Sequence, residues 1–284
     1  MRVLSLFDGM SCGQIALDQL GIKVDKYYAS EIDKYAIQIT QKNYPNTIQV
    51  GDICELKPQD FQDIDLVIGG SPCQGFSFAG KHLAFDDPRS KLFFEFVRML
   101  KGVKPKYFLL ENVRMKKEYL QVITDMLGVE PIFINSSLVS AQSRQRYYWT
   151  NIPNIEQPED RAILLVDILE DNFTSEKDKA YCIDANYFKG ASVEQYKKKA
   201  RRQLVSKIRT KSKTIRSGGR LSYDRHEWDS VDELHWRKLT PLECERLQTV
   251  PDNYTEGVSN TQRYKMLGNG WTVEVIKHIF KNLK

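Results

Sequence analysis

The first half of the chain alternates short apolar runs with helix-like stretches, and this order limits the fold more than any other feature. The strand-like runs cover residues 3–7, 27–30, 48–50, 66–68 and 107–110. The helix-like stretches cover residues 13–20, 34–43, 92–101 and 118–127. Alternating strands and helices build βαβ units, in which helices cover both faces of a sheet. We therefore predict an α/β protein with a doubly wound, Rossmann-like sheet.

The alternation ends near Pro153, and this divides the chain into three parts. Residues 1–152 form the predicted catalytic domain, whereas residues 153–236 are polar, basic and without clear periodicity, which predicts a small second module. Residues 237–284 regain helical character, with a helix start at Thr240 and a last helix over residues 271–283. We expect this last helix to pack back on the first domain.

The positive charge is concentrated in one segment. The formal net charge is only +5, yet residues 189–220 hold twelve lysines and arginines against one acid, Glu194. Such a segment favours a polyanionic partner, since the neutralisation of phosphates is where this charge contributes to affinity. The alternative is a solvated helix, for example over residues 196–204.

Several classes of protein and site are disfavoured by composition. No run approaches the ~18 apolar residues of a membrane span, and the start of the chain lacks the apolar region of a signal peptide. The five cysteines are widely spaced and include no C-x-x-C pair. We expect a soluble intracellular protein with no membrane contact, no disulfide and no metal.

Cys73 is the first candidate for a catalytic residue. It follows the apolar run 66–68 in a glycine-containing loop, while Glu111 closes the run 107–110. The carboxyl ends of parallel strands meet at one sheet edge, so Cys73 and Glu111 are expected to share a cleft. A cysteine at a strand end is more often a small apolar residue, and it is Glu111 and Arg146 that favour a nucleophile here. The other four cysteines, Cys12, Cys54, Cys182 and Cys244, are expected to be structural.

The other strand ends predict an adenosine pocket. Residues 7–13 carry Gly9 and Gly13 at a spacing that allows a tight turn, but not the G-x-G-x-x-G fingerprint of pyrophosphate binding. Glu31 closes the second strand, where a carboxylate can accept hydrogen bonds from ribose hydroxyls. Asp52, after the third strand, can take an adenine amino group.

The order of the motifs resembles one family, the cytosine-C5 DNA methyltransferases, over nearly the whole chain. The motifs are Phe7-Asp8-Gly9-x-x-x-Gly13, Glu31, Asp52, Pro72-Cys73-Gln74, Glu111-Asn112-Val113, Gln142-x-Arg144-x-Arg146, Leu239-Thr240-Pro241, Glu245-Arg246-Leu247-Gln248 and Gly268-Asn269-Gly270. Residues 92–96 and 271–276 are also similar to the animal de novo DNA methyltransferases, but the chain lacks their long regulatory regions. A compact prokaryotic or phage enzyme is therefore expected.

The resemblance implies an S-adenosyl-L-methionine-dependent methyltransferase fold with a small basic target-recognition module at residues 153–236. It implies that S-adenosyl-L-homocysteine is the product, and that Phe7 packs on the adenine. The implied catalytic residues are Cys73, Glu111, Arg144 and Arg146. The implied cofactor-binding residues are Phe7, Asp8, Gly9, Gly13, Glu31, Ile32, Asp52, Ile53, Pro72, Leu92, Asn269, Gly270 and Trp271. The chain departs from the family at Ser5, which stands for an Asp, and at Asp8, which stands for an Ala.

The expected reaction is methylation of carbon 5 of cytosine in duplex DNA. Cys73 would add to C6, Glu111 would bind ring N3 and Arg146 would hold O2, with the base flipped out of the helix. The residues expected to contact DNA are Gln74, Ser77, Lys81, Arg89, Lys197, Lys198, Arg202, Arg216, Ser217, Gly218, Gly219 and Arg220. We expect a monomer in the cytoplasm of a prokaryotic or phage-infected cell, within a restriction-modification system or outside one.

Three other functions stay open on sequence alone. A tRNA cytosine methyltransferase would use the same chemistry on a different substrate. A non-enzymatic binding protein is disfavoured by the intact Cys73, Glu111 and Arg146, and a nicotinamide dehydrogenase by the missing phosphate fingerprint. At the level of single residues, Arg144 can equally be a scaffold residue that forms salt bridges, and Trp271 can be simple core.

Overall fold

A computed structural model describes residues 1–71, 91–198, 202–208 and 234–283 of the chain. Its main feature is a seven-stranded sheet with the strand order β3-β2-β1-β4-β5-β8-β6. The five strands from β3 to β5 are parallel neighbours, whereas β8 runs antiparallel to both β5 and β6. The predicted doubly wound α/β sheet is confirmed.

The elements of this part alternate as expected from the apolar runs. The strands of the large sheet are β1 (Arg2–Leu6), β2 (Lys26–Ser30), β3 (Ile48–Gln49), β4 (Leu66–Gly69), β5 (Tyr107–Val113), β6 (Ile132–Asn135) and β8 (Gln145–Thr150). The helices around it are α1 (Cys12–Gln19), α2 (Lys34–Asn43), α3 (Lys91–Val103), α4 (Lys117–Leu127) and, from the end of the chain, α8 (Val273–Phe280).

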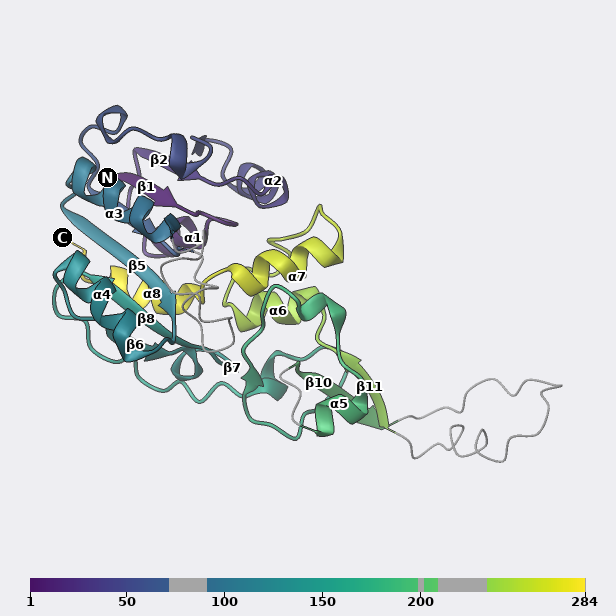
Figure 1. Ribbon diagram of the computed structural model, residues 1–284. Helices are drawn as coiled ribbons and strands as arrows, with labels where there is room; N and C mark the ends of the chain where they lie inside the picture. The colour runs from purple at the N-terminus through teal and green to yellow at the C-terminus, as the bar shows by residue number, and fades with distance from the viewer. Residues whose placement is uncertain (72–90, 199–201, 209–233, 284) are drawn as a thin grey trace, which may run out of the picture.

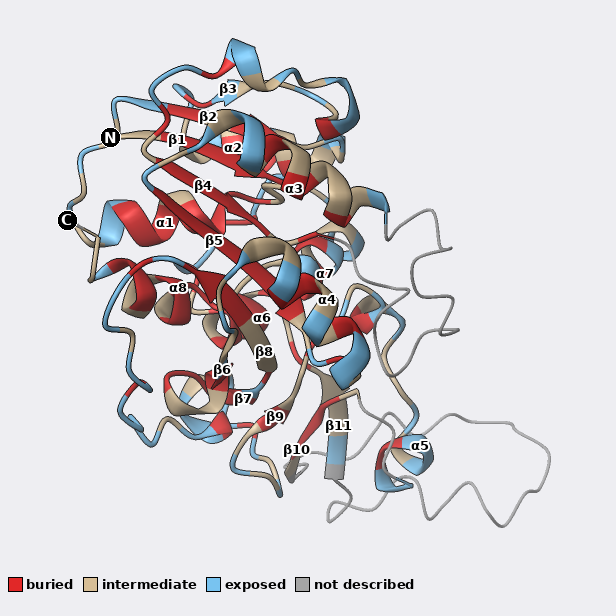
Figure 2. Cartoon of the chain, turned by 60° about the vertical axis from the view of Figure 1, so that its left-hand side comes forward, coloured by how far each residue is buried: buried red, intermediate tan, exposed pale blue. Residues whose placement is uncertain are grey.

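The sheet separates two apolar layers, because successive residues of a strand point to opposite faces. On one face, strand residues such as Val3 and Leu109 pack with Ile15 of α1 and Ile276 of α8. On the other face, Leu4 and the buried residues of β4 and β5 that point to the same side pack with α3 and α4. The central strands β1, β4 and β5 are accordingly buried along nearly their whole length (Figure 2). Helix α8, the last of the chain, thus completes the layer begun by α1.

Much of the chain between β8 and α8 forms smaller units beside the sheet (Figure 1). Strands β7 (Gln142–Ser143) and β9 (Ala180–Tyr181) pair in parallel, and β10 (Leu204–Ile208) and β11 (Leu234–Lys238) pair antiparallel. Helix α5 (Val193–Lys197) lies near β10 and β11, while α6 (Pro241–Leu247) and α7 (Asn260–Asn269) lie between them and the large sheet. Thr240 and Glu243 cap α6 reciprocally, which confirms the predicted helix start.

Four local predictions differ from the structure. Strands β6 and β8 were not expected, since no strand-like run was predicted after the helix at residues 118–127. Strand β5 extends to Val113, so Glu111 lies inside the strand and not at its end. Gly268 and Asn269 end helix α7, so the last helix starts at Val273. The alternative interpretation of the basic segment placed one solvated helix over residues 196–204. In the structure, helix α5 ends at Lys197 and strand β10 begins at Leu204.

Candidate active site

The register of β5 and β8 brings Glu111 and Arg146 together. Glu111 pairs with Tyr148, and Arg146 pairs with Val113, so the two charged side chains stand diagonally on neighbouring strands. The Nε atom of Arg146 is 2.7 Å from Oε1 of Glu111, and both side chains are nearly buried. The Nε–H group does not point straight at this oxygen, so the contact is an ion pair without a linear hydrogen bond. Burial is the largest single influence on the pKa of Arg146 and lowers it, but the combined effect of Glu111, Cys182 and Tyr148 outweighs burial and raises the pKa, which keeps the guanidinium charged.

Trp271 and Gly70 lie at the same place. The indole Nε1–H of Trp271 donates to Oε2 of Glu111 over 3.2 Å. A Cβ atom built on Gly70 would lie 3.1 Å from the same Oε2 and 2.9 Å from the indole nitrogen, so the backbone after β4 approaches both groups closely. Trp271 is half-buried and lines the site in addition to packing against the core. Cys73, the expected nucleophile, and its neighbour Pro72 lie outside the described residues, which resume at Lys91.

Arg144 is fixed by backbone carbonyl groups. Its Nη1 donates to the carbonyl of Ile183 over 2.9 Å, and its Nη2 donates to those of Gly268 and Gly270 over 3.1 and 2.8 Å. The residue is only 3% exposed. This geometry matches the scaffold reading of Arg144, because the guanidinium joins three segments of the chain and has most of its donors engaged.

Two glutamines extend this scaffold. Gln142 donates to Oε1 of Gln248, and Gln248 donates to the carbonyl groups of Leu267 and Gly270. Both glutamines are completely buried, where such a satisfied network fixes one arrangement of the backbone. The sequence placed these residues in motifs without giving them a role, since their partners are up to 106 positions away.

Cys182 also belongs to the site, although it was expected to be merely structural. Its Sγ atom accepts from Nη1 of Arg144 at 3.2 Å and lies 3.9 Å from Nη2 of Arg146. Burial raises the pKa of the Cys182 thiol, but the two guanidinium groups outweigh burial and bring the pKa below its usual range. By contrast, burial raises the pKa of Cys12 to about 12. No local pattern in the sequence distinguishes the two cysteines.

The turn after β1 is strained in a way that suits a binding loop. Phe7 and Ser11 adopt the left-handed conformation, with φ of 59° and 65°, which is costly for residues with a side chain. The turn is held by Glu31, whose Oε2 accepts from the amide of Gly9 over 2.8 Å. The other oxygen of Glu31 accepts from the amides of Ile32 and Asp33, and the carboxylate still has lone pairs free for a ribose hydroxyl.

The side chains expected around an adenosine differ in how open they are. Ile32 is 72% exposed, the highest value among the large apolar residues that the structure describes, and so offers an open apolar surface beside Glu31. Asp52 accepts from the amide of Cys54. Ile53 is only 3% exposed and its carbonyl accepts from Arg98, and Leu92 packs on the same core from α3. Asn269 is exposed at the end of α7.

Asp8 holds a carboxyl group with one oxygen unpartnered. Tyr27 donates to Oδ1 over 2.9 Å, whereas Oδ2 is enclosed by protein and has no hydrogen-bond partner in the described structure. Burial raises the pKa of Asp8 to about 6 against the opposing effect of the hydroxyl groups of Ser5, Ser11 and Tyr27. The residue as a whole is half-buried, whereas its Oδ2 atom is fully enclosed. The enclosure of Oδ2 disfavours the ionised form of the carboxyl group. A buried acceptor without a donor is a place for a ligand group.

Next to Gly9, the helix α1 begins with no room for a side chain at Gly13. A Cβ atom there would lie 2.3 Å from Cδ1 of Ile68 and 3.6 Å from the ring of Trp271. The turn, β4 and Trp271 therefore meet at this glycine, and the adenosine side of the site adjoins the side that holds Glu111.

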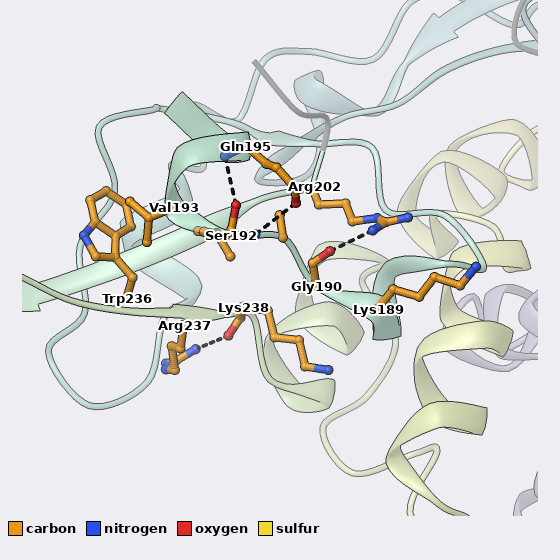
Figure 3. Close-up of a pocket in the computed structure, with 11 residues that line it drawn as sticks. Lys189, Gly190, Ser192, Val193, Gln195, Arg202, Trp236, Arg237 and Lys238 are labelled. Atoms are coloured by element: carbon orange, nitrogen blue, oxygen red, sulfur yellow. Dashed lines mark hydrogen bonds between the residues drawn. The ribbon is translucent and has the colours of Figure 1, made fainter. Parts of the chain in front are cut away.

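A basic cavity lies in the second half of the chain (Figure 3). It has a volume of about 450 Å³ and is lined by residues of the 189–195 segment, by β10 and by β11. Lys189, Arg202 and Lys238 reach its wall, with Trp236 at the opposite side. Arg202 donates to the carbonyl of Gly190 over 2.8 Å, so its charge is held in place. The remaining lining residues are Ala191, Ser192, Val193, Gln195, Leu204 and Arg237.

Part of the expected DNA contacts can be placed. Lys197 and Lys198 are exposed on and just after α5, and Lys198 pairs with Glu194 on the surface. The other expected contacts lie outside the described residues; they are Gln74, Ser77, Lys81, Arg89, Arg216, Ser217, Gly218, Gly219 and Arg220. Within the described ranges, no helix is long and apolar enough to cross a membrane. The same part of the chain has no cluster of three or more His, Cys, Asp or Glu side chains that could hold a metal ion.

Comparison with known proteins gives concordant matches. Residues 1–284 match the family model of C-5 cytosine-specific DNA methylases. The type II methyltransferase M.NlaX of Neisseria lactamica is 31% identical, and the match covers 100% of this chain and 96% of the relative. M1.ScrFI of Lactococcus lactis subsp. cremoris is 30% identical, with 99% and 77% covered.

The solved structures show a shared fold. The Entamoeba histolytica methyltransferase EhMeth matches with a TM-score of 0.74 and 19% identity, covering 100% of this chain and 99% of the other. A putative DNA modification methyltransferase encoded within a prophage of E. coli matches with a TM-score of 0.65 and 20% identity, covering 100% and 98%. Both likenesses extend over the whole chain, including the smaller units beside the sheet.

Proposed function

The chain belongs to the C-5 cytosine-specific DNA methylase family, and from this premise we propose how its residues carry out the reaction. The protein transfers a methyl group from S-adenosyl-L-methionine to carbon 5 of cytosine in DNA. The observation that carries the assignment of roles is the meeting of Glu111, Arg146 and Trp271 beside Gly70, three positions before Cys73.

Cys73 is the proposed nucleophile. Carbon 5 of an aromatic pyrimidine attacks an electrophile poorly, and addition of a thiolate to C6 turns C5 into an enamine-like carbon. When bound, S-adenosyl-L-methionine supplies the sulfonium methyl group that C5 takes. After transfer, a base removes the C5 proton, the Sγ–C6 bond breaks with its electron pair returning to sulfur, and the ring regains its double bond. The cytosine has to be flipped out of the duplex, because C6 is stacked within it.

Glu111 and Arg146 are proposed to bind the flipped base. Glu111 contacts ring N3, where negative charge develops after thiolate addition, and Arg146 contacts O2. In the absence of DNA the two side chains face each other at 2.7 Å, so the base competes with this ion pair as it enters. Trp271 keeps the Glu111 carboxyl oriented through its indole N–H. Arg144 acts by position, since it fastens the Gly268–Gly270 segment that leads to Trp271.

The residues around the first strand fit S-adenosyl-L-methionine. The strained turn of Phe7, Gly9 and Gly13 gives close backbone approach, and Glu31 offers its remaining lone pairs to the ribose. The open surface of Ile32 is proposed to cover the adenine together with Phe7. We assign the unpartnered Oδ2 of Asp8 to the cationic methionine end of the cofactor, because a buried carboxylate there gains a charged donor. Asp52, Ile53, Leu92, Asn269 and Gly270 complete the proposed pocket, with Pro72 from the loop.

The segment from residue 153 to 236 is the proposed target-recognition module. Its basic cavity presents Lys189, Arg202 and Trp236, which suit a phosphate and its nucleotide. Together with Lys197 and Lys198 these cations position the duplex without specifying sequence. We propose that the enzyme acts as a monomer, to be checked by light scattering. We further propose that the enzyme acts in the cytoplasm of a bacterial or phage-infected cell.

Methyl transfer with labelled cofactor tests the assignment. Duplex DNA and tRNA are offered separately to the wild type, Cys73→Ser and Glu111→Gln, with Glu118→Gln, an exposed carboxyl of α4, as the matched control. The expected result is label in DNA for the wild type and the control, no label for Cys73→Ser, and a large loss for Glu111→Gln. A duplex containing 5-fluorocytosine is expected to trap a covalent adduct only when Cys73 is present. Full activity of Cys73→Ser would disprove the nucleophile, and label found only in tRNA would disprove the DNA substrate.

A further inference from the structure

Cys182 stands between the two arginines of the site. Its sulfur lies 3.2 Å from Nη1 of Arg144 and 3.9 Å from Nη2 of Arg146. Arg146 in turn lies 2.7 Å from Glu111. Two contacts therefore connect the sulfur to the carboxyl group that is proposed to bind the cytosine.

The small sheet of β7 and β9 explains this position. Its parallel register pairs Gln142 with Ala180 and Ser143 with Tyr181. Arg144 and Cys182 are the first residues after β7 and β9, so the register brings them side by side. The carbonyl of Ile183, which accepts from Arg144 over 2.9 Å, fixes the backbone on the far side of the sulfur. Cys182 thus lies in the proposed target-recognition module, yet it contacts the catalytic residues.

The two positive charges around the sulfur of Cys182 favour its role as a hydrogen-bond acceptor. The guanidinium groups of Arg144 and Arg146 both face it, and a thiolate or thiol sulfur can accept from both. The lowered pKa of Cys182 agrees with this surrounding, since buried thiols elsewhere in the chain, such as Cys244, have a raised pKa.

We propose that Cys182 is a positioning residue for methyl transfer, which holds the Arg146 guanidinium against Glu111 by accepting from Arg144 and Arg146. This rests on the proposed roles of Arg146 and Glu111. Without the sulfur, Arg146 keeps only the carbonyl of Gln145 and the Glu111 carboxylate as partners among the described residues. The guanidinium then samples more rotamers, and fewer of the bound cytosines meet it in the reactive arrangement.

Three variants of the full-length protein test the proposal. Cys182→Ala removes the acceptor, and Cys182→Ser keeps an acceptor of similar shape. Cys244→Ala, at a completely buried cysteine of α6 away from the site, is the control for truncation of a buried thiol. For each variant, kcat and KM are measured with duplex DNA and labelled cofactor, S-adenosyl-L-homocysteine affinity by calorimetry, and Tm by thermal unfolding.

The expected result for Cys182→Ala is a kcat lower by about tenfold to a hundredfold, the effect of losing a hydrogen bond to a charged group. KM for the cofactor and the affinity for S-adenosyl-L-homocysteine stay within about twofold, because the adenosine side is untouched. Cys182→Ser recovers kcat to within about threefold of the wild type. Cys244→Ala is expected to lower Tm and to leave kcat unchanged. This control separates a loss of stability from a loss of the positioning of Arg146.

Two outcomes would overturn the proposal. One is a Cys182→Ala protein with wild-type kcat. The other is a Cys182→Ser protein that folds with wild-type Tm yet is as slow as Cys182→Ala, since this would show that the acceptor does not matter. A wild-type protein that fails to methylate duplex DNA would instead disprove the proposed function, so the two failures can be told apart.

Discussion

Replacement of Asp8 by Asn is expected to change how stability depends on pH. The carboxyl of Asp8 has a pKa of about 6 in the folded protein, against 3.8 as its ordinary value. A raised carboxyl pKa stabilises the folded state at low pH, and this stabilisation is lost as pH rises from about 3.8 to 6, because the unfolded chain releases its proton first. Above pH 6 the folded protein carries the full cost of an ionised, partly unpartnered carboxylate.

The size of the effect follows from the two pKa values. The difference between 3.8 and about 6 corresponds to about 3 kcal/mol. Because the unfolded carboxyl is already more than half ionised at pH 4, about 2.5 kcal/mol of this difference falls between pH 4 and pH 8. We therefore expect the stability of Asp8→Asn relative to the wild type to rise by about 2.5 kcal/mol between pH 4 and pH 8. A comparison across pH cancels the constant cost of placing an amide at this site.

Urea unfolding of both proteins at pH 4, 6 and 8 measures this difference. Asp171→Asn, which removes an exposed carboxyl group, is the matched control and is expected to run parallel to the wild type. The same Asp8→Asn protein is expected to bind S-adenosyl-L-homocysteine more weakly at pH 8. In the wild type, that affinity falls about tenfold for each pH unit below 6, because binding needs the ionised carboxyl. Parallel stability curves for the wild type and Asp8→Asn would refute the reasoning.

Three further outcomes are expected from single substitutions. Gly268→Ala would place a Cβ atom 2.1 Å from the carbonyl carbon of Asp184, so we expect a loss of unfolding free energy of about 3 kcal/mol by urea unfolding, and wild-type stability would contradict this backbone contact. Trp271→Phe keeps a ring but removes the hydrogen bond to Glu111, so kcat is expected to fall about tenfold while Tm changes little; an unchanged kcat would argue against a role for the indole N–H. Lys189→Ala is expected to lower the slope of log K against log salt for DNA binding by about 0.9, and an unchanged slope would remove the basic cavity from the DNA interface.

The sequence predicts the parallel part of the sheet well, because its strands are buried on both faces and read as continuous apolar runs. It also predicts that Glu111 and Cys73 share a cleft at the carboxyl edge of the sheet; Glu111 lies within β5 and not after it, and Cys73 lies outside the described residues, so this stays a prediction. Strand β8 is missed because it begins with Gln145 and Arg146 and runs antiparallel, so it continues no βαβ unit. Its register with β5 is nevertheless what pairs Glu111 with Arg146.

The scaffold behind the site could not be predicted for a different reason. Arg144 contacts residues 38 to 126 positions away, and Cys182 reaches the site through a two-residue strand pair. Contacts of this kind depend on how distant segments pack, and no periodicity or turn signal encodes them. No motif or spacing around Cys182 marks it as part of the site.

The link from Gln142 through Gln248 to the Gly270 backbone also has a consequence for synthesis. The segment that carries Trp271 is synthesised long after the parallel strands of the large sheet. A nascent polypeptide that has not reached Trp271 therefore lacks the carbonyl group of Gly270 that Arg144 and Gln248 bind and the indole that contacts Glu111.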